Sequence, residues 1–191
     1  YRVLVASTPD RLADGRADVW DSGRTESAAS VAVRYAGPEL SPSTRYHWTV
    51  QVWDEQGHRL PDAPAARFET GLLSTDGVTG WDGARWICMA GKAPNSTGSP
   101  LLRRQTALKT GRVREARLYV SALGVYDAYV NGRRVTVPQG GGTTYELLPP
   151  GWTNYDTTVN YFTYDVTGLL ERQQPQVTLA AVLGNGWYNG R

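Results

Sequence analysis

The stretch RYHWTVQVW at residues 45–53 carries the clearest strand pattern in the sequence. Its residues alternate strictly between two kinds of side chain, which is the period of a β-strand. The face of large apolar groups is Tyr46, Trp48, Val50 and Val52, and the polar face is His47, Thr49 and Gln51. Because such an aromatic face needs a covering layer, the stretch predicts a sheet packed against a partner sheet.

Shorter strand patterns surround this stretch, and each is bounded by Gly, Pro, Asp or Ser. They lie at residues 1–7, 17–23, 30–37 and 65–71. Five short strands in about 70 residues are typical of a small β-sandwich. We therefore predict an all-β fold with a fibronectin type III-like sandwich at residues 1–73.

A second run of strand patterns begins after a segment rich in Gly, Asp, Ser and Thr, which we interpret as a linker at residues 74–85. The patterns lie at residues 100–108, 114–124, 125–137, 159–166 and 176–184. Asn131-Gly132 favours a tight hairpin turn, because both central residues of that turn need positive φ. These features predict a second β-sandwich at residues 86–191, with a single helical turn after Asp165.

Composition excludes several classes of function. Twenty Lys and Arg balance eighteen Asp and Glu, so we expect no nucleic-acid partner. No apolar run reaches the length of a membrane span, so we expect no membrane partner. The single cysteine, Cys88, cannot form an internal disulfide. The histidines, His47 and His58, lie in no nucleophile motif, and we expect no catalytic residue in the chain.

Aromatic and amide side chains gather in two turn regions of the second sandwich, PPGWTNYD at 149–156 and GNGWYNGR at 184–191. Sugars are held by aromatic faces and by Asn or Asp side chains that bridge their hydroxyls. The candidate carbohydrate-binding residues are Trp152, Asn154, Asp156, Asn185, Trp187, Tyr188 and Asn189. The same pattern also fits aromatic packing under a loop, with Asn serving the turn.

The motifs together resemble the N-terminal region of bacterial α-L-rhamnosidases. The resemblance covers essentially the whole chain in order, through YRVLVAS, VWDSGRTES, TRYHWTVQVWDEQG, RFETGLL, WDGARWI, PLLRRQTAL, ARLYVSALGVYDAYVNGRRV, PPGWTNYD, YFTYDVTGLL and LAAVLGNGWYNGR. It implies that a fibronectin-like module precedes a jelly-roll, galactose-binding-like sandwich, which would be incomplete in these residues. It also implies that further β-domains and a helical barrel follow, and that acidic residues of the barrel remove terminal α-L-rhamnose with inversion.

Some members of that family bind rhamnose through calcium in this jelly roll. The resemblance therefore makes Ca²⁺ a candidate cofactor, with Asn131, Asp156 and Asn189 as candidate ligands. The sequence leaves calcium open, because no Asp and Asn are adjacent at these positions. The expected partners are rhamnose-containing glycosides and downstream domains of the same polypeptide. The alternative is that both sandwiches are structural spacers that bind no sugar.

Overall fold

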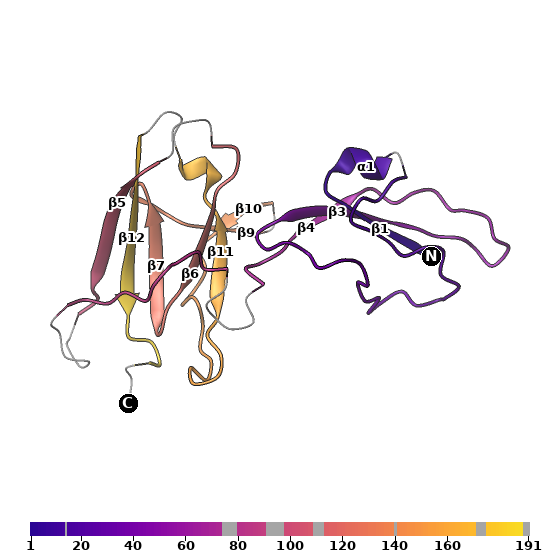
Figure 1. Cartoon of the computed structure of the whole chain (residues 1–191). Coiled ribbons are helices and arrows are strands. Elements are labelled where there is room, and N and C mark those ends of the chain that lie inside the picture. Colours follow the sequence, from indigo (N-terminus) through magenta and orange to yellow (C-terminus); the bar gives the residue numbers. More distant parts are fainter. Residues whose placement is uncertain are drawn as a thin grey trace. The chain divides into compact units, whose positions relative to one another are not determined.

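The computed structural model describes residues 1–13, 15–73, 80–90, 98–108, 113–139, 141–170 and 175–188. The chain divides into two compact units, Tyr1–Arg85 and Trp86–Arg191 (Figure 1). Both units are built from antiparallel strands, with one short α-helix, α1 (Pro9–Ala13), among the described residues. The predicted all-β fold is confirmed. None of the helices in these segments is long and apolar enough to cross a bilayer.

The first unit contains one four-stranded sheet in the order β2-β1-β3-β4. The strands are β1 (Arg2–Ala6), β2 (Trp20–Asp21), β3 (Arg45–Gln51) and β4 (Ala66–Glu69). The central pairing joins β1 to β3, with Val5 opposite Trp48. The stretch that dominates the sequence pattern is therefore a central strand of this sheet.

The segments that cover the two faces of this sheet differ from those predicted from the sequence. Leu4 and Ala6 of β1 are fully buried with Leu12, so α1 packs on the face that was predicted to be polar. On the aromatic face, Tyr35 packs edge-on against Trp20, with ring centroids 5.0 Å apart. Among the described residues this unit has a single sheet, so an extended segment, and not a second sheet, contacts the aromatic face at Trp20.

The predicted strand at residues 30–37 is wrong. The structure has no strand there, and Val31 is 79% exposed. Alternation favours a strand only where one face of the pattern is buried against a neighbour. This segment alternates in sequence, but its valines remain near the surface.

The described residues of the second unit form three antiparallel sheets, in the orders β5-β12-β7-β8, β11-β6 and β10-β9. Figure 1 shows the β11-β6 sheet beside the four-stranded β5-β12-β7-β8 sheet. The strands are β5 (Leu101–Ala107), β6 (Arg117–Ser121), β7 (Val125–Val130), β8 (Arg133–Arg134), β9 (Val137–Gln139), β10 (Gly142–Thr144), β11 (Tyr161–Asp165) and β12 (Gln176–Gly184).

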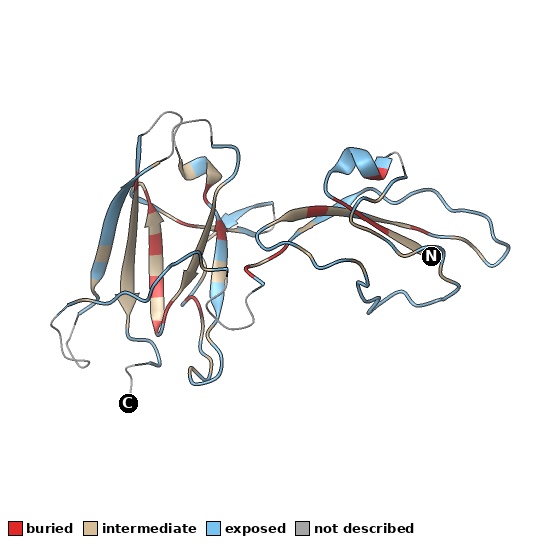
Figure 2. Ribbon diagram, in the orientation of Figure 1, coloured by how far each residue is buried: buried red, intermediate tan, exposed pale blue. Residues whose placement is uncertain are grey.

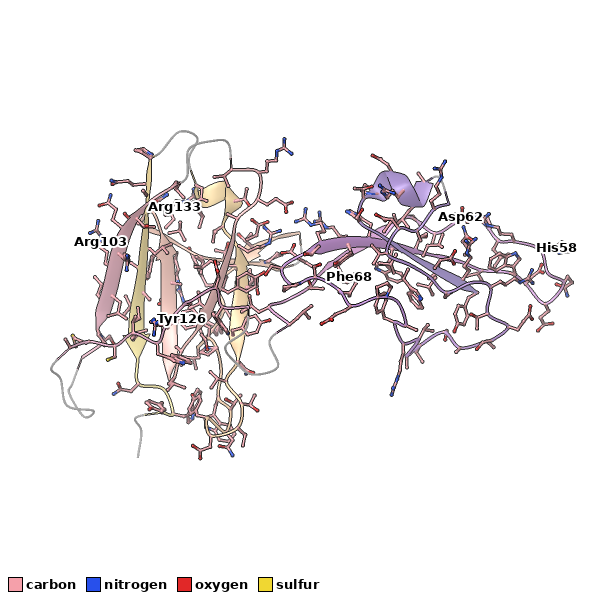
Figure 3. All side chains as sticks on the ribbon, viewed as in Figure 1. His58, Asp62, Phe68, Arg103, Tyr126 and Arg133 are labelled. Atoms are coloured by element: carbon pink, nitrogen blue, oxygen red, sulfur yellow. The ribbon has the colours of Figure 1, made fainter. Side chains whose placement is uncertain are left out.

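The core of the second unit is formed mainly by residues of the β5-β12-β7-β8 sheet and of the β11-β6 sheet, and several of them are coloured as buried in Figure 2. Val130 of β7 and Tyr164 of β11 are almost completely buried. The hydroxyl of Tyr126, labelled in Figure 3, lies 3.1 Å from the hydroxyl of Tyr164. Burial raises the pKa of both tyrosines, so both hydroxyls stay neutral and serve each other as hydrogen-bond partners.

The predicted helical turn is present as a short 3-10 helix, η1 (Thr167–Leu169). The carboxylate of Asp165 accepts a hydrogen bond from the main-chain nitrogen of Thr167, at 3.0 Å. Leu169 and Leu170 pack against the buried core. The sequence pattern therefore identified both the start of this turn and its apolar side.

The predicted hairpin at Asn131-Gly132 is confirmed. Asn131 has φ of 51° and Gly132 has φ of 77°, as a primed turn requires. The amide nitrogen of Asn131 donates to the carbonyl of Leu169 at 2.9 Å, and its side-chain oxygen accepts from the nitrogen of Thr178 at 3.0 Å. One side chain therefore joins the hairpin to η1 and to β12.

Substitutions of Asn131 separate its backbone role from its hydrogen bonds. Asn131→Gly keeps positive φ but removes both side-chain bonds, so we expect a loss of about 2 kcal/mol in unfolding free energy. Asn131→Ala removes the same bonds and places a Cβ in the left-handed region, which costs about 1 kcal/mol more. Urea unfolding followed by tryptophan fluorescence measures both values. Equal stability of the two variants would contradict the proposed backbone contribution.

Candidate functional site

The structure brings the two predicted aromatic regions together at one end of the second sandwich. The ring of Tyr155 packs edge-on against the ring of Tyr188, with centroids 5.6 Å apart and an interplanar angle of 82°. These residues belong to the loop at 149–156 and to the loop that follows β12. We call the described parts of these two loops, residues 149–156 and 185–188, the loop end.

Strand pairing explains why the loops meet. Gly184, the last residue of β12, pairs with Val125, the first residue of β7. The main-chain nitrogen of Tyr126 donates to the carbonyl of Pro149 at 3.0 Å. The start of β7 therefore positions the loop at 149–156 through a main-chain hydrogen bond. It positions the loop after β12 through strand pairing.

Three large aromatic side chains of the loop end are open to solvent. Trp152 is 64% exposed, Trp187 is 53% exposed and Tyr188 is 50% exposed. Burial of these rings under the loops would have favoured a purely structural role. Exposed rings of this size, gathered in one place, are characteristic of interaction sites.

Polar groups accompany these rings. Asn154, Asp156 and Asn185 are exposed, whereas Asn189 lies outside the described residues. The side-chain oxygen of Asn154 accepts a hydrogen bond from the nitrogen of Asp156 at 3.2 Å, so this group supports the turn. The carboxylate of Asp156 has no partner among the described residues, which leaves it as an acceptor for a ligand hydroxyl.

The structure does not bring Asn131 and Asp156, the two candidate calcium ligands that it describes, together. Asn131 lies at the far end of β7 from the loop end, about 20 Å of strand away. Its side-chain oxygen and nitrogen are both used within the fold. The described residues contain no group of three His, Cys, Asp or Glu side chains that could hold a metal. Asn131 and Asp156 therefore belong to different parts of the sandwich.

One residue that shapes the loop end was not identified from the sequence. Gly124 has φ of 101°, and a Cβ there would lie 2.6 Å from the carbonyl oxygen of Gly184 and 2.8 Å from that of Asn185. The turn before β7 thus lies directly against the start of the loop after β12. The signal in the sequence was a glycine between two strand patterns, where the chain must turn sharply.

Comparison with known proteins assigns both units. The family model described as the α-L-rhamnosidase N-terminal domain matches residues 111–191. A second model, the Rha78A-like N-terminal immunoglobulin domain, matches residues 1–74. The two models together identify the chain as matching the N-terminal region of α-L-rhamnosidases. The family predicted from the ordered motifs is therefore confirmed.

Individual α-L-rhamnosidases agree with this assignment. A curated relative from Alteromonas sp. (strain LOR) is 35% identical over 193 residues, which is all of this chain and 20% of the relative. The solved α-L-rhamnosidase of Dictyoglumus thermophilum matches 98% of the chain at 29% identity, with a TM-score of 0.82 over 21% of its own length. That of Aspergillus terreus matches 98% at 28% identity, with a TM-score of 0.69. The chain thus spans about a fifth of the length of these relatives.

The close contact at Gly124 predicts that adding a single methyl group there strongly lowers the stability of the fold. Gly124→Ala would place its Cβ against two carbonyl oxygens in a backbone region unfavourable to alanine, so we expect a loss of about 2 kcal/mol or more. Gly168→Ala is the matched control, because no atom lies within 4 Å of its Cβ position and its φ is not positive. Thermal unfolding measures both. Similar melting temperatures for the two variants would contradict the close approach at Gly124.

Proposed function

We propose that this chain forms the non-catalytic N-terminal domains of an α-L-rhamnosidase and that its loop end contacts rhamnose-containing glycosides. The observation that carries the proposal is the exposure of Trp152, Trp187 and Tyr188 in one place. Several large exposed rings within two contacting loops are more typical of an interaction surface than of a spacer. The rest of the enzyme, including the acidic residues that hydrolyse the glycoside with inversion, lies outside these residues.

The chemistry of the loop end suits a deoxy sugar. Rhamnose presents a methyl group and axial and equatorial C–H groups, which pack on aromatic faces, and three ring hydroxyls. Trp187 and Tyr188 supply the apolar surface. The exposed carboxylate of Asp156 and the exposed amide of Asn185 supply hydrogen-bonding groups for the hydroxyls. Such a contact would hold the glycoside near the polypeptide without taking part in bond cleavage.

Calcium is not required by this arrangement. A Ca²⁺ site takes six to eight oxygen ligands and usually several carboxylates. The described loop end contains one carboxylate, Asp156, and Asn131 is remote from it. We therefore propose a sugar contact made directly by side chains. The experiment below measures binding both with Ca²⁺ and after chelation.

Isothermal titration with L-rhamnose tests the proposal. We expect heat of binding from the folded chain, equal in the presence of Ca²⁺ and after chelation. Trp187→Ala should weaken binding about tenfold or more, because it removes an aromatic anchor. Trp86→Ala is the control, since Trp86 is 66% exposed but lies outside both loops.

Two outcomes would refute parts of this proposal. Absence of heat from a chain shown to be folded by near-ultraviolet circular dichroism would refute the sugar contact and favour the spacer role. Heat that appears only with Ca²⁺ would refute direct recognition and would direct attention to Asp156 as a metal ligand.

A further inference from the structure

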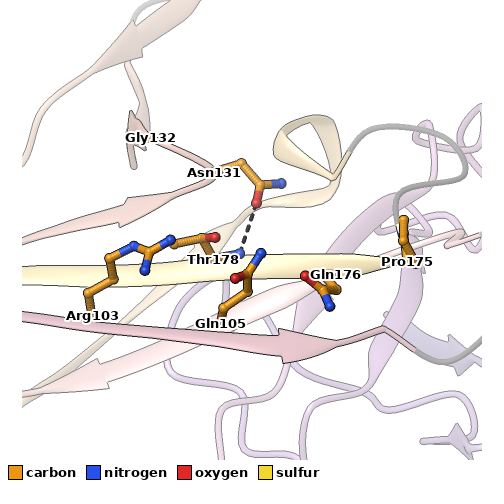
Figure 4. Close-up of a pocket in the computed structure, with 7 residues that line it drawn as sticks. All are labelled: Arg103, Gln105, Asn131, Gly132, Pro175, Gln176 and Thr178. Atoms are coloured by element: carbon orange, nitrogen blue, oxygen red, sulfur yellow. Dashed lines mark hydrogen bonds between the residues drawn. The ribbon is translucent and has the colours of Figure 1, made fainter.

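A polar pocket lies on the outer face of the β5-β12-β7-β8 sheet, toward the hairpin end of the second sandwich. Its volume is about 590 Å³, which suits a ligand of the size of one or two sugar rings. Figure 4 shows the lining side chains converging from two strands and the hairpin. The lining residues are Arg103, Gln105, Asn131, Gly132, Pro175, Gln176 and Thr178.

The floor of this pocket is fixed by the register of two strands. Gln105 of β5 pairs with Thr178 of β12, and Arg103 pairs with Ala180. Paired residues of neighbouring strands point to the same face, so Arg103, Gln105 and Thr178 share one surface. Because β12 is also paired with β7, Thr178 lies on a central strand, whereas Arg103 and Gln105 lie on β5 at the edge of the described sheet.

The wall of the pocket is the Asn131-Gly132 turn. Asn131 is held by its bonds to Leu169 and to Thr178, so it is fixed in place. Gly132 adds no side chain, which keeps the entrance above β12 open. The wall is therefore rigid and leaves room for a ligand.

The charge of the pocket is positive. None of the described lining residues is acidic, and the guanidinium of Arg103 forms no ion pair with a described residue. An unpaired arginine presents two parallel donors, which match the two oxygens of a carboxylate.

The remaining groups match hydroxyls. The carboxamides of Gln105 and Gln176 each offer a donor and an acceptor, and the Thr178 hydroxyl can act as either. Pro175 adds a small apolar surface at the rim. Donors and acceptors arranged around one cation fit a polyhydroxylated ligand that carries a single negative charge.

We propose that this pocket is a second carbohydrate site, which binds a sugar bearing a carboxylate, that is, a uronic acid residue. Arg103 pairs with the carboxylate, and Gln105, Gln176 and Thr178 bind ring hydroxyls. The site is separate from the loop end, because the six residue steps from Thr178 to Gly184 extend about 20 Å along β12. The proposal stands whether or not the loop end binds rhamnose.

Titration of the full-length protein with three probes tests the assignment. D-Glucuronate carries both the ring and the carboxylate, D-glucose carries the ring alone, and acetate carries the carboxylate alone. We expect glucuronate to bind at least tenfold more tightly than either of the other two.

Two arginine variants locate the binding. Arg103→Gln should weaken glucuronate binding at least tenfold, because it removes a charge-assisted pair. Arg104→Gln is the matched control, since Arg104 is exposed on the same strand and points to the opposite face. The control should change the affinity less than twofold. Gln176→Ala provides a second variant that retains the charge and should weaken binding severalfold.

Each contrary result overturns the proposal. Absence of glucuronate binding, or equal binding of glucose, shows that the pocket does not recognise an acidic sugar. Equal binding of acetate shows a simple anion site. Equal loss in the Arg103 and Arg104 variants shows non-specific attraction, and loss of glucuronate binding in Trp187→Ala assigns the ligand to the loop end.

Discussion

Strand β12 is the element on which both candidate sites depend. It is hydrogen-bonded along one edge to β5 and along the other to β7. Its register is therefore fixed by two neighbouring strands. Its first residues form the floor of the polar pocket, and its last residue, Gly184, leads directly into the loop with Trp187. A shift of one residue would reverse its faces, remove Val177 from the core and dismantle both sites together.

Local sequence signals predicted the parts of the fold that local chemistry determines. The Asn131-Gly132 turn and the turn after Asp165 depend on φ values and on a short side-chain bond, and both were found as predicted. The segment at 30–37 and the partner sheet of the first unit depend on what covers a strand, which alternation does not reveal.

The same distinction applies to the two candidate sites, because the sequence indicated the loop end but not the polar pocket. Aromatic and amide residues clustered in the sequence indicated the loop end, and the structure brings the two loops together through Tyr155 and Tyr188. The polar pocket gave no such signal, because Gln105 and Gln176 are ordinary outward residues of separate strands. Their convergence results from a pairing between segments about 70 residues apart. A sequence pattern can mark which residues face outward, but only the register shows which of them face outward together.

The two sites also differ in how they are held, and this bears on how they would act. The loop end is built from turns fixed at a few points, such as the bond between Tyr126 and Pro149, so its rings can adjust to a ligand. The pocket lies on a paired ladder, where a side chain can rotate but the backbone cannot yield without breaking the core. Sites that share no side chain and lie about 20 Å apart on one rigid strand should act independently, so that a polysaccharide carrying both neutral and acidic residues would gain from both contacts additively.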